Sequence, residues 1–193
     1  MPWGLKRFHQ SGQTHFVIFC CYHRRPLLST LVAKRTIEAA LERVRHSFRL
    51  YIFGYVIMPE HVHLLLSEPH RDTLAHAIKS LKQGVSRRLI GEAEHFWQKR
   101  YYDFNVRDYD QFVEKLRYIH RNPVKRGLCE APEHWEWSSF RHDATGSEGR
   151  VQIESELTAR KRERAVARFT SAATRAYINL ENKITGGNLH ARW

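Results

Sequence analysis

Two histidines, His61 and His63, stand two residues apart inside the apolar stretch MPEHVHLLL. In a β-strand, residues i and i+2 point to the same face, so the two imidazoles would lie side by side. Neutral imidazoles are common ligands of divalent metals, and this pair can supply half of a metal site. The competing interpretation is two polar side chains on the open face of a half-buried strand, because a chain with 13 histidines contains about one such pair by chance.

The residues around this pair favour the metal interpretation. The flanking segments YVIM and LLL are strongly apolar, which is typical of a strand in the middle of a sheet. Buried polar groups without partners are costly, so two imidazoles in such a place need a partner. Nearby acids are limited to Glu60 and Glu68, and Glu60 is placed to orient a histidine from behind.

Tyr118, in the segment YDQFVEKLRYIHRN at 109–122, is the next residue whose position suggests chemistry. The segment has helical periodicity, and Tyr118 lies roughly 160° from the centre of its apolar stripe. It shares that opposite face with Lys115, Arg121 and Asn122. A nucleophile for a phosphodiester needs an accessible phenol and basic neighbours that hold the phosphate. An exposed tyrosine without a function fits the spacing at least as well.

The hydrophobic pattern predicts the elements that must position these side chains. Strands are predicted at 14–23, 49–58 and 61–68, an extended aromatic segment at 96–108, and helices at 29–48, 73–91 and 109–122. Thr73 is expected to cap the second helix and Pro123 to stop the third. This order predicts an α+β, ferredoxin-like split βαβ fold, with an antiparallel sheet and helices on one face. Residues 149–193 are expected to form a basic, helical C-terminal extension to a domain at 1–148, with its helix at about 152–182.

Composition limits the partners. The 193 residues carry 32 Lys and Arg against 20 Asp and Glu, a net charge of +12, and the pI is about 10.0. Such a balance favours binding to polyanions, and the 12% aromatic residues offer rings on which bases stack; a solvated basic surface is the alternative.

Three cysteines without a CxxC pair indicate neither disulfides nor a cysteine zinc site. No segment suggests export or membrane insertion, so the cytoplasm is the expected compartment.

Several separated motifs together resemble one family. MPEHVHLL, FWQKRYYDFNVRD, LRYIHRNPVKRGL and the later EHWEWSSFR resemble the REP-associated tyrosine transposases, a branch of the HUH single-strand transposases. The match runs in order from about residue 8 to residue 142. The resemblance implies that 1–148 is an HUH transposase and nuclease domain with the ferredoxin-like fold.

The resemblance also implies roles for individual residues. His61 and His63 would be the HUH pair, Asn122 the third ligand of Mg²⁺ or Mn²⁺, and Tyr118 the nucleophile. The implied activity is cleavage and rejoining of single-stranded DNA beside repetitive extragenic palindromes that fold as hairpins, through a 5′-phosphotyrosine intermediate. Imidazole ligands suit Mn²⁺ better than Mg²⁺, which prefers oxygen.

Basic residues near the expected site are candidates for holding the DNA backbone. They lie on the 73–91 helix and around the 109–122 segment: Lys79, Lys82, Arg87, Arg100, Lys115, Arg121, Lys125 and Arg126. For any one of them a solvated helix face is an equal alternative. The REP-associated branch implies a monomer associated with the nucleoid, whereas insertion-sequence relatives act as dimers.

Two other functions remain open at this point. A ferredoxin-like sheet with exposed aromatic residues can bind single-stranded nucleic acid without catalysis. A metal-dependent hydrolase would use a metal-bound water, leave free 5′-phosphate ends and form no link between protein and DNA.

Overall fold

The computed structural model describes residues 14–89 and 95–155 of the chain. The chain divides into two units, Met1–Glu154 and Ser155–Trp193, and the description below concerns the first. This division falls after the predicted domain boundary at residue 148. The helix predicted at about 152–182 lies largely outside the described residues, and its described part, 152–155, is not helical.

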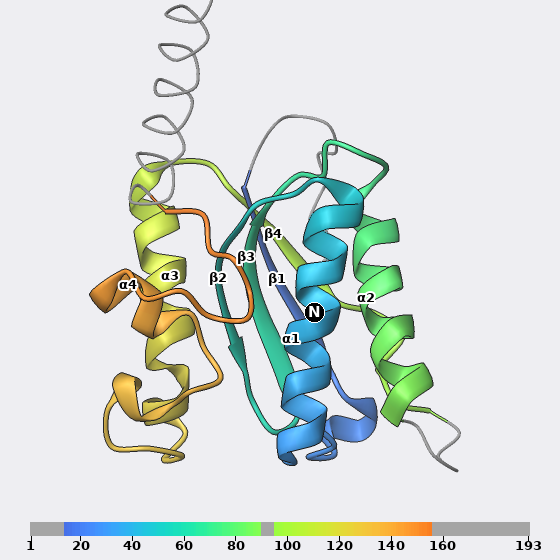
Figure 1. Ribbon diagram of the computed structural model, residues 1–193, viewed down its shortest axis with the longest axis horizontal. Helices are drawn as coiled ribbons and strands as arrows, with labels where there is room; N and C mark the ends of the chain where they lie inside the picture. The colour runs from blue at the N-terminus through green and yellow to red at the C-terminus, as the bar shows by residue number, and fades with distance from the viewer. Residues whose placement is uncertain (1–13, 90–94, 156–193) are drawn as a thin grey trace, which may run out of the picture. The chain divides into compact units, whose positions relative to one another are not determined.

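A four-stranded antiparallel sheet forms the centre of the first unit (Figure 1). β1 (Thr14–Cys20) pairs with β3 (His61–Ser67) on one side and β4 (Tyr102–Val106) on the other, and β2 (Ile52–Ile57) pairs with β3. The order β2-β3-β1-β4 is that of a split βαβ fold. The predicted α+β class and the hairpin predicted over 49–68 are therefore confirmed.

Two helices, α1 (Leu31–Phe48) and α2 (Leu74–Leu89), cover one face of this sheet (Figure 1). α2 begins where the Thr73 hydroxyl accepts the backbone N–H of His76 at 3.2 Å, as the predicted cap requires. Alternate residues of the strands pack against both helices in the larger hydrophobic core. The predicted end of α2 at Gly91 lies outside the described residues.

α3 (Tyr109–Lys125) lies on the opposite face of the sheet, so the prediction that the helices share one face is wrong for this helix (Figure 1). The cause lies in β3, where every residue except Ser67 is buried. A strand that is apolar on both sides needs cover on both sides. Leu65 of β3 and Ile119 of α3 meet in a second, smaller core. α3 therefore covers the face of β3 from which the two histidines project.

Gly54 of β2 permits the close approach of α3. A Cβ at this position would stand 2.5 Å from Cδ1 of Leu116 and 3.3 Å from Oγ of Ser139, which is closer than ordinary contacts between heavy atoms. The missing side chain thus sets how near α3 lies to the sheet.

α3 continues through Pro123, and the prediction that this proline stops the helix is wrong. Proline has no N–H, so the carbonyl of Ile119 lacks its usual helical donor. The next turn still forms, because the N–H of Arg126 donates to the carbonyl of Asn122 at 3.1 Å and Pro123 is buried. Gly127, with φ of 66°, follows the helix in the left-handed region that favours glycine.

The chain after α3 returns to the sheet. It contains the short helices η2 (Pro132–His134) and α4 (Phe140–Thr145). Val151 and Ile153 are then buried in the larger core, and the N–H of Glu154 donates to the carbonyl of the first residue of β2 at 2.7 Å. Residues up to Glu154 therefore complete the first unit. Across the two described ranges, no helix combines the length and apolar character needed to cross a bilayer.

Candidate active site

His61 and His63 lie side by side on β3, as their spacing predicts. Their side chains point toward α3, and the residues are only 5% and 2% exposed. The two Nε2 atoms are 2.7 Å apart, a hydrogen-bond distance in which one ring donates and the other accepts. The two histidines thus converge on one point at the end of β3 nearest Glu60.

Burial keeps these imidazoles neutral. It lowers the pKa of His63 to about 3. It also lowers the pKa of His61, although the carboxylate of Glu60 opposes this shift. A neutral imidazole carries a free lone pair on one nitrogen, which is the form that binds metals. The pair is therefore ready to act as ligand at neutral pH.

Glu60 stands behind His61 and is itself held by two arginines. Its Oε1 lies 3.2 Å from Nδ1 of His61, and it accepts hydrogen bonds from Nη2 of Arg126 at 2.8 Å and of Arg24 at 3.3 Å. Burial raises the pKa of Glu60, but opposing contributions, among them the guanidinium charges of Arg126 and Arg24 and a backbone hydrogen bond, leave the pKa below its ordinary value. A charged carboxylate beside Nδ1 favours the form of His61 with its lone pair on Nε2.

Tyr118 lies beside the histidines at the edge of the packed face of α3. Its ring centroid is 5.4 Å from that of His63 and 5.9 Å from that of Phe16, and the residue is 39% exposed. The prediction that Tyr118 lies opposite the apolar stripe of its helix holds only in part, because its ring contacts the rings of Phe16 and His63 in the sheet. Nζ of Lys125 is 5.7 Å from the tyrosine ring. The phenol is thus accessible and has a cation close by.

Asn122 follows Tyr118 by one helical turn and lines the same cleft. The residue is 6% exposed, and its Oδ1 is buried without a hydrogen-bond partner in the described residues. A buried acceptor without a donor is costly. Two neutral imidazoles and one such amide oxygen fit a divalent cation of the Mn²⁺ type. The described residues contain no cluster of three His, Cys, Asp or Glu placed for a metal; Asn122, in the same cleft as the two imidazoles, is the candidate third ligand.

A cleft of about 340 Å³ joins these groups. Its remaining lining is largely basic: Arg24, Lys125 and Arg126. Basic side chains around an open cleft attract phosphate groups. The arrangement brings a phenol, two imidazoles and three basic side chains to one place.

Arg24 was not predicted from the sequence, although a signal exists. The register of β1 and β3 pairs Cys20 with His61, so residues directly after β1 must lie near the histidines. Arg24 is in the short helix η1 (Tyr22–Arg24) just beyond that point. Once the two strands are paired, the basic run HRR at 23–25 therefore marks the edge of the site.

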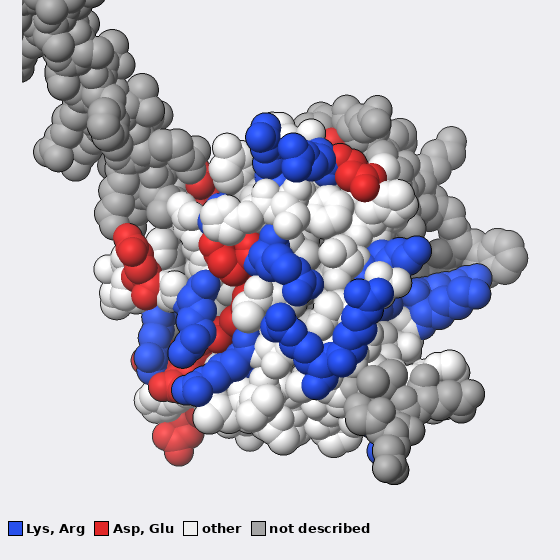
Figure 2. Space-filling model, turned by 45° about the vertical axis from the view of Figure 1, so that its right-hand side comes forward, with Lys and Arg blue, Asp and Glu red and all other residues white. Residues whose placement is uncertain are grey.

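The other predicted DNA contacts divide into two groups. Lys79, Arg87, Arg100 and Arg121 are exposed and stay candidates. Figure 2 shows Lys and Arg side chains spread over much of the surface turned toward the viewer, which agrees with attraction to a polyanion.

Two of the predicted lysines also have contacts within the fold. Lys82 donates to the carbonyl of Gln98 at 2.7 Å, and burial lowers the pKa of its ammonium group. Lys115 lies over the ring of Phe104 at 5.1 Å and pairs with Glu114 at 2.9 Å. The ammonium of Lys82 is therefore engaged by the fold, and that of Lys115 is partly so.

Known proteins resemble this chain in sequence. The model of the family described as "Transposase IS200 like" matches residues 9–122. A putative REP-associated tyrosine transposase of Haemophilus influenzae is 35% identical over 100 residues, which cover 45% of this chain and 57% of that relative. The REP-associated tyrosine transposase of Escherichia coli is 24% identical over 139 residues, covering 72% of this chain and 82% of the relative.

A solved structure shares the fold. It is a REP-associated tyrosine transposase bound to a REP hairpin, with a TM-score of 0.65 and 22% sequence identity, and the match covers 79% of this chain and 92% of that one. The match to the family model includes both histidines, Tyr118 and Asn122, the residues that meet in the cleft. The chain belongs to the IS200-like transposase family.

Proposed function

We propose that this chain cleaves and rejoins single-stranded DNA, with Tyr118 as the nucleophile. The main support is the cleft, in which the Tyr118 ring lies 5.4 Å from the ring of His63 and shares the lining with His61 and Asn122. These residues come from a strand and a helix far apart in sequence, and ordinary packing does not require a phenol at this place.

In the proposed reaction, the scissile phosphate enters the basic cleft. Arg24, Lys125 and Arg126 hold the phosphate charge. The Tyr118 phenol loses its proton to solvent and its oxygen attacks phosphorus. The bond to the 3′ oxygen breaks, the departing oxygen takes up a proton, and the 5′-phosphate stays on Tyr118. Because the phosphoester is conserved, a 3′-hydroxyl can reverse the step without ATP.

A divalent ion held by His61, His63 and Asn122 would act as a Lewis acid toward the phosphate. Glu60 orients His61 for that role. Since two of the three donors are imidazole nitrogens, we expect Mn²⁺ to support activity at least as well as Mg²⁺. Chelation should abolish cleavage and leave much of the DNA affinity, because the basic residues remain.

The proposed substrate is a strand that folds as a hairpin. A relative with the same fold was solved with a REP hairpin, and this chain carries a net charge of +12. The affinity for such DNA should fall steeply with salt concentration. Selection from a random library of hairpins would identify the sequence that the chain prefers.

The test compares Tyr118→Phe with Tyr109→Phe, a tyrosine 74% exposed on the same helix. Labelled hairpin DNA with a single-stranded flank is incubated with Mn²⁺ and separated on a denaturing gel. Wild type and Tyr109→Phe should give a protein–DNA adduct, and Tyr118→Phe should bind the DNA without forming one. An equal adduct from Tyr118→Phe would refute the assignment. Cleavage with free 5′-phosphate ends and no adduct would indicate a hydrolase, and binding without cleavage in every variant a binding module.

A further inference from the structure

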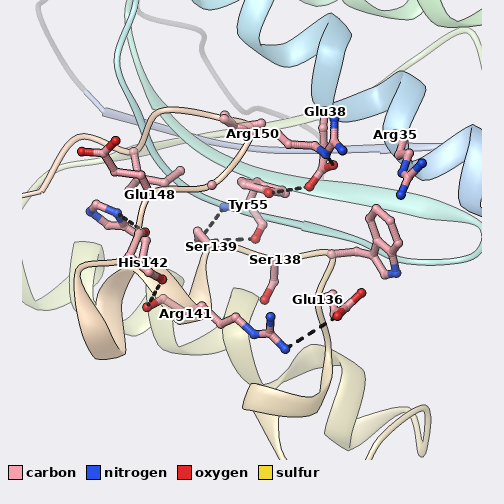
Figure 3. A pocket seen from close by; sticks show the side chains of 15 residues that line it. Arg35, Glu38, Tyr55, Glu136, Ser138, Ser139, Arg141, His142, Glu148 and Arg150 are labelled. Carbon is pink, nitrogen blue, oxygen red and sulfur yellow. Dashed lines mark hydrogen bonds and ion pairs between the residues drawn. The ribbon is translucent and has the colours of Figure 1, made fainter.

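The cleft around Tyr118 carries positive charge that its own lining does not balance. A pocket of about 440 Å³ between α1, β2 and residues 136–153 gives the contrast. Its lining holds three arginines and three glutamates, which balance one another (Figure 3): Arg35, Glu38, Glu136, Arg141, Glu148 and Arg150. The part of the cleft lining that the structure describes contains Arg24, Lys125 and Arg126 and no carboxylate. The cleft is therefore the place that favours an anion, and its three cations can be compared.

Arg24 reaches the cleft from a strained turn. His23 and Arg24 follow β1 with φ angles of 49° and 54°, in the left-handed region that is unfavourable for residues with a Cβ. Glycine would adopt these angles without strain. Strained residues persist only where their surroundings fix them, and they cluster at functional sites. Two such residues in a row at the edge of the cleft point to a function for the turn.

Backbone hydrogen bonds hold this turn in place. The N–H of Cys21 donates to the carbonyl of Glu60 at 2.8 Å, which ties the turn to the corner before β3. The N–H of Tyr22 donates to the carbonyl of Phe96 at 2.9 Å, which ties it to the segment before β4. These bonds involve the main chain alone. The direction of the Arg24 side chain is therefore fixed before its guanidinium contacts anything.

The guanidinium of Arg24 is held loosely. Three nitrogen atoms face Oε1 of Glu60: Nη2 of Arg126 at 2.8 Å, Nδ1 of His61 at 3.2 Å and Nη2 of Arg24 at 3.3 Å. A carboxylate oxygen offers about two lone-pair sites, and the contact of Arg24 is the longest of the three. Its Nη1 lies 3.9 Å from Sγ of Cys20, which is a weak acceptor. Since the side chain is also 53% exposed, Arg24 can leave Glu60 for a stronger acceptor.

The charge of Arg24 acts on both imidazoles of the site. Burial is the main cause of the low pKa of His61 and of His63, and the positive charge of Arg24 lowers both pKa values further. The guanidinium thus lies near the point on which the two histidines converge. An anion bound at that point would be close to Arg24.

We propose that Arg24 leaves Glu60 and binds the scissile phosphate, while Arg126 stays on Glu60 and keeps that carboxylate directed at His61. The inference rests on the proposed function, because it assigns a step of the same reaction. A guanidinium can donate two parallel hydrogen bonds to a phosphate, and these strengthen as negative charge grows on the phosphate during the attack of Tyr118. The strained turn positions Arg24 before the DNA arrives, which lowers the ordering cost. Arg24 therefore acts mainly on the rate, and Arg126 mainly on the metal site.

The first test compares Arg24→Ala with Arg126→Ala. The rate of adduct formation is measured with saturating hairpin DNA and Mn²⁺, and the affinity for Mn²⁺ is measured by calorimetry without DNA. Arg24→Ala should lower the rate about 100–1,000-fold without lowering the Mn²⁺ affinity, because it removes a positive charge near the imidazoles. Arg126→Ala should lower the Mn²⁺ affinity, and its rate should recover at high Mn²⁺ concentration. A variant whose site was merely damaged would lose Mn²⁺ affinity and rate together.

Two further variants show whether the guanidinium itself is needed. Arg24→Lys keeps the charge but not the paired N–H groups, so its rate should lie between those of wild type and Arg24→Ala. Arg25→Ala removes a charge from the exposed neighbouring residue and should keep the rate of wild type.

The second test examines the turn and does not depend on Arg24→Ala folding. His23→Gly is compared with Arg49→Gly, because Arg49 is also exposed and has a φ angle of 51° at the end of α1. Glycine relieves strain at both positions but adds freedom to the unfolded chain, so both variants should unfold at nearly the urea concentration of wild type. Arg49→Gly should keep the rate of adduct formation. His23→Gly should lower it, because the turn no longer fixes the direction of Arg24.

The outcomes separate this inference from the proposed function. A wild-type rate in Arg24→Ala, a rate in Arg24→Ala that recovers with excess Mn²⁺, or an equal loss in Arg25→Ala overturns the assignment of Arg24 and leaves the proposed chemistry intact. An unchanged rate in His23→Gly overturns the positioning role of the turn. Absence of any adduct in wild type refutes the proposed chemistry and this inference together.

Discussion

Gly54 controls the distance between the sheet and α3, which makes it a sensitive test of how the fold positions Tyr118. In Gly54→Ala, the new Cβ would stand 2.5 Å from Cδ1 of Leu116 and 3.3 Å from Oγ of Ser139. Carbon atoms in contact prefer about 3.5–4.0 Å, so Leu116 must retreat by about 1 Å. Overpacking of this kind costs about 1–3 kcal/mol, and the lost flexibility of the unfolded chain offsets about 0.4–1 kcal/mol. We expect a net loss of about 1–2 kcal/mol in the free energy of unfolding.

The effect on the reaction should exceed the effect on stability. α3 carries Tyr118 and Asn122, whereas His61 and His63 are fixed in β3. A displacement of reacting groups by about 1 Å can lower a rate by about a hundredfold. Urea unfolding gives the free energy. The rate of adduct formation is measured well below the melting temperature, where every molecule is folded.

Two further variants make the comparison decisive. Gly149→Ala adds a Cβ whose nearest neighbour, the carbonyl oxygen of Val151, is 4.0 Å away, and should change stability by less than about 0.5 kcal/mol. In a Leu116→Ala background the main obstacle is gone, so Gly54→Ala should cost almost nothing there. If Gly54→Ala costs the same with and without the Leu116 side chain, the steric explanation is wrong.

Three other predictions concern charge and hydrogen bonding. Burial lowers the pKa of His120 to about 4, so the imidazole binds a proton less readily in the folded state than in the unfolded chain. The free energy of unfolding should therefore fall as the pH drops from about 6.5 to about 4, by up to about 3 kcal/mol. Urea unfolding in the presence of a chelator measures this slope, and His120→Gln should reduce it. Glu60→Gln should weaken binding of Mn²⁺ by about 10–100-fold in calorimetry, and an unchanged affinity would refute the orienting role of Glu60. Lys82→Met should lower stability with little effect on DNA affinity, whereas Lys79→Met should lower the salt slope of DNA binding by about one; equal effects in both assays would contradict this division.

The order of strands and helices could be predicted because it depends on local patterns. The hairpin over 49–68 follows from two apolar runs around Pro59 and Glu60. The N-cap of α2 at Thr73 depends only on residues next to it in the sequence. His61 and His63 share a face because the period of a strand is two residues.

The position of α3 and the persistence of the helix past Pro123 depend on the whole fold. The buried run in β3 needs cover on both faces, a requirement that the predicted arrangement, with the helices on one face, did not meet. One missing hydrogen bond at Pro123 is outweighed by burial of this turn, an energy that no local pattern contains. The contact between Arg24 and Glu60 likewise arises only once β1 and β3 are paired.

Tyr118 and Asn122 are separated by one turn of a single rigid helix. In the proposed reaction, the attacking group and one anchor of the cation would therefore move as one body. A strand end joined to Tyr118 could not be carried to a distant second site by swinging α3 away, because that motion would also dismantle the ion's coordination. Exchange of strands in this chain should instead bring the incoming 3′ end to a stationary helix.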